Sequence, residues 1–167
     1  MAKIDNIGGT NQINLTASVG RNGTNHKDDV IAVQAMLKYA LEGTRGWENS
    51  QFPQPTGTMD AQTMSLIRKF QRSLRRSNPS ASVDGRIDPA KGQLTRGKRA
   101  MWTIIALNTE AMETWLLNKR LGANYIHAVG LLYPAFKNAV GDEGVGTLNL
   151  PLEGSSNGVG SLGLELE

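Results

Sequence analysis

Two stretches of the chain carry apolar residues at intervals of three and four, the spacing that places side chains on one face of a helix. Asp28 and Asp29 precede the first stretch, and we expect one of these carboxylates to cap the helix at the positive end of its dipole. Gly43 and Gly46 follow it, which predicts that the helix ends there. The apolar positions between them are Val30, Val33, Leu37 and Leu41.

The second stretch follows a loop at residues 47–58, in which Pro53 and Pro55 exclude regular structure. We expect Asp60 to cap this helix. Its buried face is predicted to consist of Met64, Ile67, Phe70 and Leu74. The basic residues of the same helix fall mostly on its other faces and are expected to meet solvent: Arg68, Lys69, Arg72, Arg75 and Arg76.

Further helices are predicted in the second half of the chain. Asp88 followed by Pro89 is typical of a helix start, with an acidic cap and proline in the first turn. Gly92 and Gly97 keep that turn short. A long apolar helix is expected at residues 99–121. Another is expected at residues 123–136, bent or ended near Pro134.

The two ends of the chain lack helical periodicity. Residues 1–26 are rich in Gly, Asn and Thr, which predicts a loop with a short strand near Ile13. Beyond Gly141 the composition changes to Gly, Ser, Asn and Leu, and residues 162–167 alternate as a strand does. We therefore expect a mainly α protein with an extended Gly/Ser-rich tail at residues 141–167.

Composition excludes several kinds of site and segment. The 167 residues contain no cysteine, which excludes disulfides, cysteine-based zinc sites and cysteine nucleophiles. The N-terminal residues lack the apolar core of a secretory signal peptide, and no apolar run is long enough to span a membrane. We expect a protein made in the cytoplasm without a signal peptide.

Charge is unevenly distributed. Residues 68–99 carry ten basic residues against two acidic ones, a net charge of +8, whereas residues 141–167 carry five acidic residues and no basic one. The basic block could neutralise nucleic-acid phosphates. No aromatic residues alternate with its arginines, however, so we interpret it as the solvated face of a helix and predict no nucleic-acid partner.

An internal repeat is the most informative feature. Residues 30–34 and 67–71 share the pattern apolar-x-x-apolar-Gln, ending in Gln34 and Gln71. Residues 57–60 and 85–88 share the pattern Gly-x-apolar-Asp. We interpret the glycines and aspartates most simply as turn and cap residues. A glutamine beside a core face needs a partner, which is either the backbone of a loop or a ligand in a groove.

In this order, the repeated features resemble the small three-helix peptidoglycan-binding domain. That family opens with a Val-x-x-Leu-Gln helix and an Asp-Gly-x-Phe-Gly-x-x-Thr turn. An Ala-Val-x-x-Phe-Gln helix and a second Asp-Gly turn follow. The resemblance covers residues 18–108, with an insertion at 90–98. The chain departs from the pattern at Thr56, Met59 and Asp60, which stand where Asp, an aromatic residue and Gly are expected.

The resemblance implies a binding module without catalytic activity. It divides the chain into an N-terminal extended segment (1–17), the peptidoglycan-binding-like domain (18–108), additional helices packed on it (109–140) and the acidic tail (141–167). It implies a shallow groove for the peptide stem or glycan of a bacterial cell wall. The candidate ligand contacts are Gln34, Gln71, Asp84 and Arg86, and the candidate turn and cap residues are Gly57, Asp60, Gly85, Asp88 and Pro89.

No catalytic constellation can be assembled from the sequence. His26 and His127 are far apart, no His-x-x-x-His pair exists, and Glu110 and Glu113 are expected to be solvated. We expect no enzyme activity, metal or cofactor. The alternative function is a structural or adaptor subunit of a phage-tail-like contractile injection or secretion machine, with partner proteins held through the C-terminal tail. Either protein would act at the cell wall or within a secreted or phage-like particle.

Overall fold

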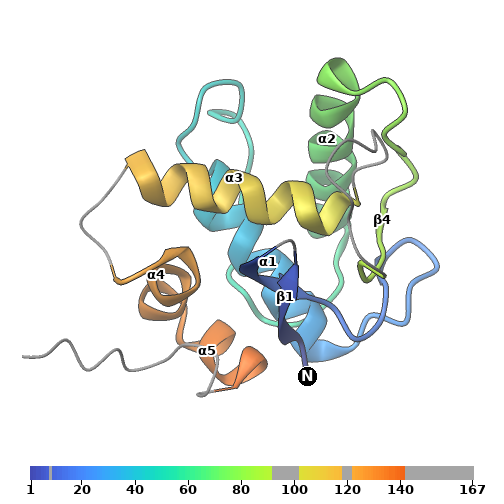
Figure 1. Ribbon diagram of the computed structural model, residues 1–167. Coiled ribbons are helices and arrows are strands. Elements are labelled where there is room, and N and C mark those ends of the chain that lie inside the picture. The colour runs from blue at the N-terminus through green and yellow to red at the C-terminus, as the bar shows by residue number, and fades with distance from the viewer. Residues whose placement is uncertain (8, 92–101, 118–121, 142–167) are drawn as a thin grey trace, which may run out of the picture.

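The computed structural model describes residues 1–7, 9–91, 102–117 and 122–141, and in this part the protein is mainly helical with two small sheets (Figure 1). The mainly α class is therefore confirmed. The helices are α1 (Lys27–Leu41), α2 (Ala61–Ser77), α3 (Thr103–Leu117), α4 (Tyr125–Leu132) and α5 (Pro134–Val140). The strands are β1 (Lys3–Ile7), β2 (Thr10–Asn14), β3 (Val19–Gly20) and β4 (Arg86–Ile87).

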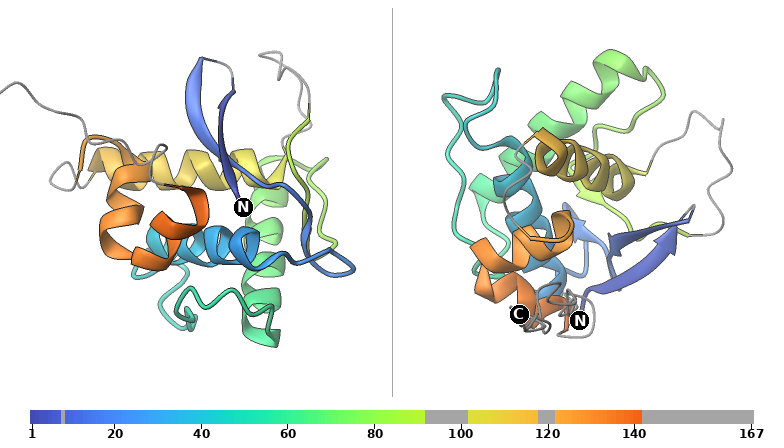
Figure 2. Two further views of the ribbon diagram at one scale, coloured as in Figure 1. Left: turned by 90° about the horizontal axis from the view of Figure 1, so that it is seen from below. Right: turned by 60° about the vertical axis from the view of Figure 1, so that its left-hand side comes forward.

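Helix α1 is the centre of the molecule. Its residues from Asp29 to Leu37 are all buried, because α3 and the α4–α5 pair pack against different sides of it (Figure 2). The predicted apolar face is therefore only part of what this helix buries. Helix α2 keeps a one-sided pattern instead, with Ile67 and Phe70 buried and Arg72, Arg75 and Arg76 exposed as predicted.

The N-terminal residues form a β-hairpin rather than the predicted loop with one short strand. β1 and β2 pair antiparallel, with Lys3 opposite Asn14 and Ile7 opposite Thr10. The free edge of β2 is held by Asn108 of α3, whose side-chain amide accepts from the Ile13 N–H and donates to the Ile13 carbonyl, both at 2.8 Å. Asn108 thus takes the place of a third strand at this position.

A second small sheet joins the segment before α1 to the turn after α2. In it β3 pairs antiparallel with β4, so that Gly20 lies opposite Arg86. Gly20 has φ +110°, and a side chain there would meet the carbonyl oxygen of Gly85. Glycine is required at this position because the two backbones approach so closely.

The prediction that Asp28 or Asp29 caps α1 is wrong, because neither side chain binds the first turn of the helix. Asp29 is fully buried and reaches back along the chain. Its carboxylate accepts hydrogen bonds from the backbone N–H groups of Thr16 and Ala17 and from the Thr16 hydroxyl, at 2.8–3.0 Å. The predicted cap of α2 is confirmed, since Asp60 accepts from the Thr63 N–H at 2.6 Å.

The helix start predicted at Asp88 and Pro89 is also wrong for the residues described there, which carry no helix up to Lys91. Asp88 instead pairs with Arg86, with 2.7 Å between its Oδ1 and the guanidinium. The rest of the predicted turn, residues 92–98, lies outside the described residues.

The remaining helices differ from prediction mainly in extent. Helix α3 occupies the middle of the range 99–121, whose ends lie outside the described residues. The helix predicted at 123–136 is interrupted near Pro134 as expected, but Pro134 also begins α5. The acidic tail lies outside the described residues apart from Gly141. Within the described ranges, no helix is both long enough and apolar enough to cross a membrane.

Candidate ligand-binding groove

Gln34 ties α1 to the turn before α2. Its side-chain oxygen accepts from the Gly57 N–H at 3.0 Å, and its side-chain nitrogen donates to the Thr58 carbonyl at 2.9 Å and to the Thr63 hydroxyl at 3.0 Å. Only 2% of this residue is exposed. The glutamine therefore satisfies the polar groups of the turn from inside the protein.

Gln71 makes the equivalent bonds one repeat later. Its oxygen accepts from the Gly85 N–H at 2.7 Å, and its nitrogen donates to the Arg86 carbonyl at 2.8 Å and to Asp84 at 3.0 Å. It is fully buried. The sequence repeat is thus a structural repeat, and both glutamines bind loop backbone, the first of the two partners considered. Their amides point inward and are already hydrogen-bonded within the protein.

Asp84 and Arg86 flank the second glycine turn and reach the surface. Burial opposes ionisation of Asp84, but the Arg86 N–H at 2.9 Å and the Gln71 amide outweigh it and hold the pKa of this carboxyl below its ordinary value. The Arg86 guanidinium is held by Asp88, and the Arg86 side chain is 41% exposed. The turn therefore presents a fixed carboxylate and a partly open cation to solvent.

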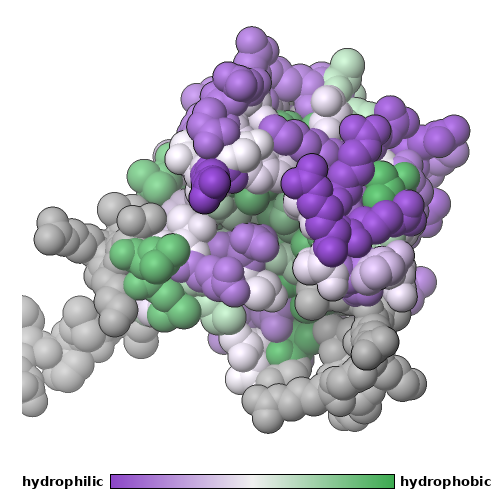
Figure 3. Space-filling model, turned by 90° about the horizontal axis from the view of Figure 1, so that it is seen from above, coloured by the Kyte–Doolittle hydropathy of each residue, from purple (hydrophilic) through white to green (hydrophobic). Residues whose placement is uncertain are grey.

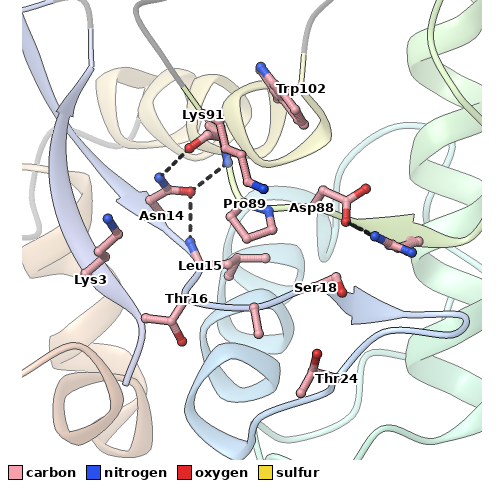
Figure 4. A pocket seen from close by; sticks show the side chains of 13 residues that line it. Lys3, Asn14, Leu15, Thr16, Ser18, Thr24, Asp88, Pro89, Lys91 and Trp102 are labelled. Atoms are coloured by element: carbon pink, nitrogen blue, oxygen red, sulfur yellow. Dashed lines mark hydrogen bonds and ion pairs between the residues drawn. The ribbon is translucent and has the colours of Figure 1, made fainter.

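A hollow of about 800 Å³ lies where this turn meets the N-terminal residues, and we call it the main groove (Figure 4). One wall comes from the chain between β2 and α1, the other from residues that follow β4, and Trp102 stands at the upper end. Its lining includes three cations and three hydroxyl groups: Lys3, Arg86, Lys91, Thr16, Ser18 and Thr24.

Asn14 holds the two walls of the main groove together. Its side-chain oxygen accepts from the N–H groups of Leu15 and Ala90, and its nitrogen donates to the Ala90 carbonyl and to Asp5, all at 2.8–3.0 Å. This role could not be predicted, because the partner segment lies 76 residues away in the chain. The N-terminal residues, predicted to be a separate extension, form one side of the groove.

A smaller hollow of about 320 Å³, the side pocket, adjoins the main groove. The two share Arg86, Asp88 and Trp102, and the side pocket adds Asp84 together with Ser80 and Ser82. Two of the four candidate contacts, Asp84 and Arg86, therefore line hollows, whereas Gln34 and Gln71 are buried and line neither of them. Trp102 was missed, since a tryptophan within the apolar helix predicted at residues 99–121 is expected to belong to the core.

The chemistry of this surface suits a ligand that is anionic at some points and apolar at others. Lys3, Arg86 and Lys91 can bind carboxylates, although Lys3 also contacts Asp5 at 3.0 Å. The indole of Trp102 offers a flat apolar face at the junction of the two hollows. Asp88 and the hydroxyl groups can accept or donate hydrogen bonds to amides. A peptide rich in carboxylates, attached to sugar rings, has these properties.

No family model, curated protein or solved structure matches this chain.

The other residues considered for chemistry do not converge on the described surface. His26 lies 3.7 Å from Asp29, and His127 accepts from the Ala123 N–H at 3.2 Å. Within the described ranges, no three residues of the types that ligate metals come together. Glu113 is exposed as expected, whereas Glu110 is partly buried on α3.

Proposed function

We propose that this protein is a non-catalytic peptidoglycan-binding module. The observation that carries the proposal is the position of Arg86, which stands with Asp88 and Trp102 between the main groove and the side pocket. A ligand that occupies both hollows has to pass this cation. The resemblance of residues 18–108 to a peptidoglycan-binding domain suggests the ligand, and the paired glutamine turns support that resemblance.

The peptide stem of peptidoglycan would bind through its carboxylates. In this proposal Arg86 receives one carboxylate, because Asp88 already fixes its guanidinium and little side-chain entropy is lost on binding. Lys91 and Lys3 attract the remaining negative charge from the rim. The groove is open and mixed in polarity, which favours an extended chain over a small enclosed molecule.

The glycan would contact Trp102. Sugar rings present C–H groups on one face, and an indole ring offers an apolar surface on which such a face can stack. The Ser80 and Ser82 hydroxyl groups and the Asp84 carboxylate of the side pocket supply hydrogen-bond partners for sugar hydroxyls. The protein would then hold the wall without cleaving it.

Co-sedimentation with purified bacterial sacculi over a series of salt concentrations tests the proposal. We expect retention that persists at 0.5 M salt, because a groove with buried floor contacts is screened less than an exposed basic face (Debye length about 4 Å there). Retention that disappears with salt would mean that only the basic residues of α2 adhere, and the proposal would fail.

An adaptor role is the second candidate function, in a phage-tail-like contractile machine or a related assembly. Four large apolar side chains are exposed near the ends of α3 and α4: Leu116, Leu117, Leu131 and Leu132. Exposed apolar groups of this kind favour contacts with other proteins. Failure to bind sacculi, together with association of the protein with neighbouring subunits, would favour this function over the first.

A further inference from the structure

A second groove lies between α2 and α3, away from Arg86. Two hollows of about 440 and 150 Å³ share Leu74, Ser77 and Glu110, so they form one channel along the facing sides of these helices. We call it the α2–α3 groove. Helix α2 stands at a steep angle to α3 (Figure 1), and the first residues after α1 close the far end.

The floor of the α2–α3 groove is apolar. Leu41, Phe70 and Leu74 line the wider part, and Ala81 and Ala106 line the narrower part. Figure 3 looks onto this side of the molecule and shows pale and green side chains in a hollow between purple ones. At the end of α3 the apolar surface continues with Leu117, which is 85% exposed. An aliphatic side chain placed here would bury its own apolar surface and that of the groove floor.

The α3 rim of the groove is acidic. Glu110 and Glu113 both line it, and neither forms a salt bridge with a basic side chain of the described residues. Burial raises the pKa of Glu110 above its ordinary value, and the nearby charge of Glu113 raises it further. Both effects disfavour the ionised form of Glu110, and a cation placed at this rim would stabilise it.

The opposite rim carries hydroxyl groups rather than acids. Ser73 and Ser77 of α2 donate to backbone carbonyls of their own helix, and Arg45 stands at the loop end. A ligand cation is therefore directed to the α3 rim, where it would neutralise two carboxylates. An apolar channel of this shape with one acidic rim is complementary to an aliphatic side chain that is followed by an ammonium group.

We propose that the α2–α3 groove binds a segment of a partner protein in which leucine-like side chains flank a lysine. The apolar side chains occupy the floor, and the lysine ammonium lies between Glu110 and Glu113. The groove would serve protein assembly, whereas the main groove serves the wall. The proposal does not rest on wall binding. The residues that line the α2–α3 groove are different from those that line the main groove and the side pocket.

The test is a titration of the ¹⁵N-labelled protein with the peptide acetyl-Leu-Lys-Leu-amide, followed by amide chemical shifts. Acetyl-Leu-Gln-Leu-amide, which lacks only the charge, is the matched control. We expect the lysine peptide to shift the amides of Leu74, Ser77, Thr109 and Glu110 and to bind at least about threefold more tightly than the control. The double variant Glu110→Gln/Glu113→Gln should remove this preference, and Arg86→Ala should leave it intact.

Three results would overturn the proposal. They are equal binding of the two peptides, shifts confined to the main groove, and a preference that survives the Glu110→Gln/Glu113→Gln double variant. The cell-wall peptide is the other possible source of an ammonium group. A soluble muropeptide with a free ammonium group distinguishes it from a partner protein. If the muropeptide shifts the α2–α3 groove and the lysine peptide does not, the groove belongs to wall recognition and the partner segment is excluded.

Discussion

The side chain of Gln71 closes a ring with the backbone around Gly85, accepting from the Gly85 N–H at 2.7 Å and donating to the carbonyl of the following residue at 2.8 Å. Gln34 makes the same ring with Gly57. Each glutamine fixes one turn, and the second turn carries Asp84 and Arg86. The candidate ligand contacts are therefore positioned by a buried amide that the ligand itself does not need to touch.

Gln71→Ala should destabilise the protein by about 2–4 kcal/mol, because it leaves the buried Gly85 N–H without a partner and creates a small cavity. Gln62→Ala on the same helix is the control, since Gln62 bonds only to Gln51 at the surface, and its effect should stay within about 0.5 kcal/mol. Urea unfolding followed by circular dichroism measures both. Similar losses for the two variants would contradict the role given to Gln71.

Gly20→Ala should be far more damaging than Gly43→Ala, although both glycines have positive φ, +110° and +75°. At Gly43 a methyl group meets open space, so only backbone strain of about 1 kcal/mol is expected. At Gly20 the methyl group would meet the carbonyl oxygen of Gly85, which forces β3 and β4 apart. Thermal unfolding of the two variants gives the comparison. Equal shifts in Tm would mean that this strand pair can separate freely.

Asp60→Asn should weaken the dependence of stability on pH in acid. The Thr63 N–H holds the pKa of Asp60 below its ordinary value, so the folded state favours the charged carboxylate. The resulting stability is present above the unfolded pKa, about 3.9, and is lost as the pH falls through the lower folded pKa. Urea unfolding between pH 2 and pH 6 should show a shallower acid loss in the variant. Asp28→Asn, which removes no cap bond, is the control.

Glu110→Gln should stabilise the protein at pH 7 more than at pH 4. The pKa of this carboxyl is raised by burial and by Glu113, so its ionised form disfavours folding once the pH exceeds the ordinary glutamate pKa, about 4.3. The variant removes that cost only where the wild-type residue is ionised. An acidic residue retained at a cost in stability is consistent with a binding role for the α2–α3 groove. Equal effects at both pH values would show that Glu110 is fully solvated.

The glutamine turns could be predicted from the sequence because the residues that form each one lie within 24 positions of one another and repeat. The Asp60 cap was predictable for the same reason, since the bond to Thr63 is local. Asp29 has the same local pattern, yet its carboxylate is used by Thr16 in a segment without regular structure. A cap and a long-range anchor look alike in the sequence.

The N-terminal hairpin could not be predicted, because its stability comes from distant residues. Asn108 binds the edge of β2 at Ile13, and the Tyr125 hydroxyl donates to Asn108 at 2.6 Å. Half of its ten strand residues are Asn, Asp or Lys, which are depleted in strands. One wall of the main groove depends on this hairpin through Asn14, so only the Arg86 side of the groove could be inferred from the chain.

The most direct test of wall binding compares two arginines, Arg86 and Arg76, at 0.5 M salt. Arg86 lines both hollows, whereas Arg76 lies on the exposed face of α2, and replacing either by alanine changes the net charge equally. We predict that Arg86→Ala reduces co-sedimentation with sacculi about tenfold or more, as expected for loss of a charge-assisted contact, and that Arg76→Ala leaves it unchanged. Equal retention of both variants, or loss in both, would contradict binding through the main groove.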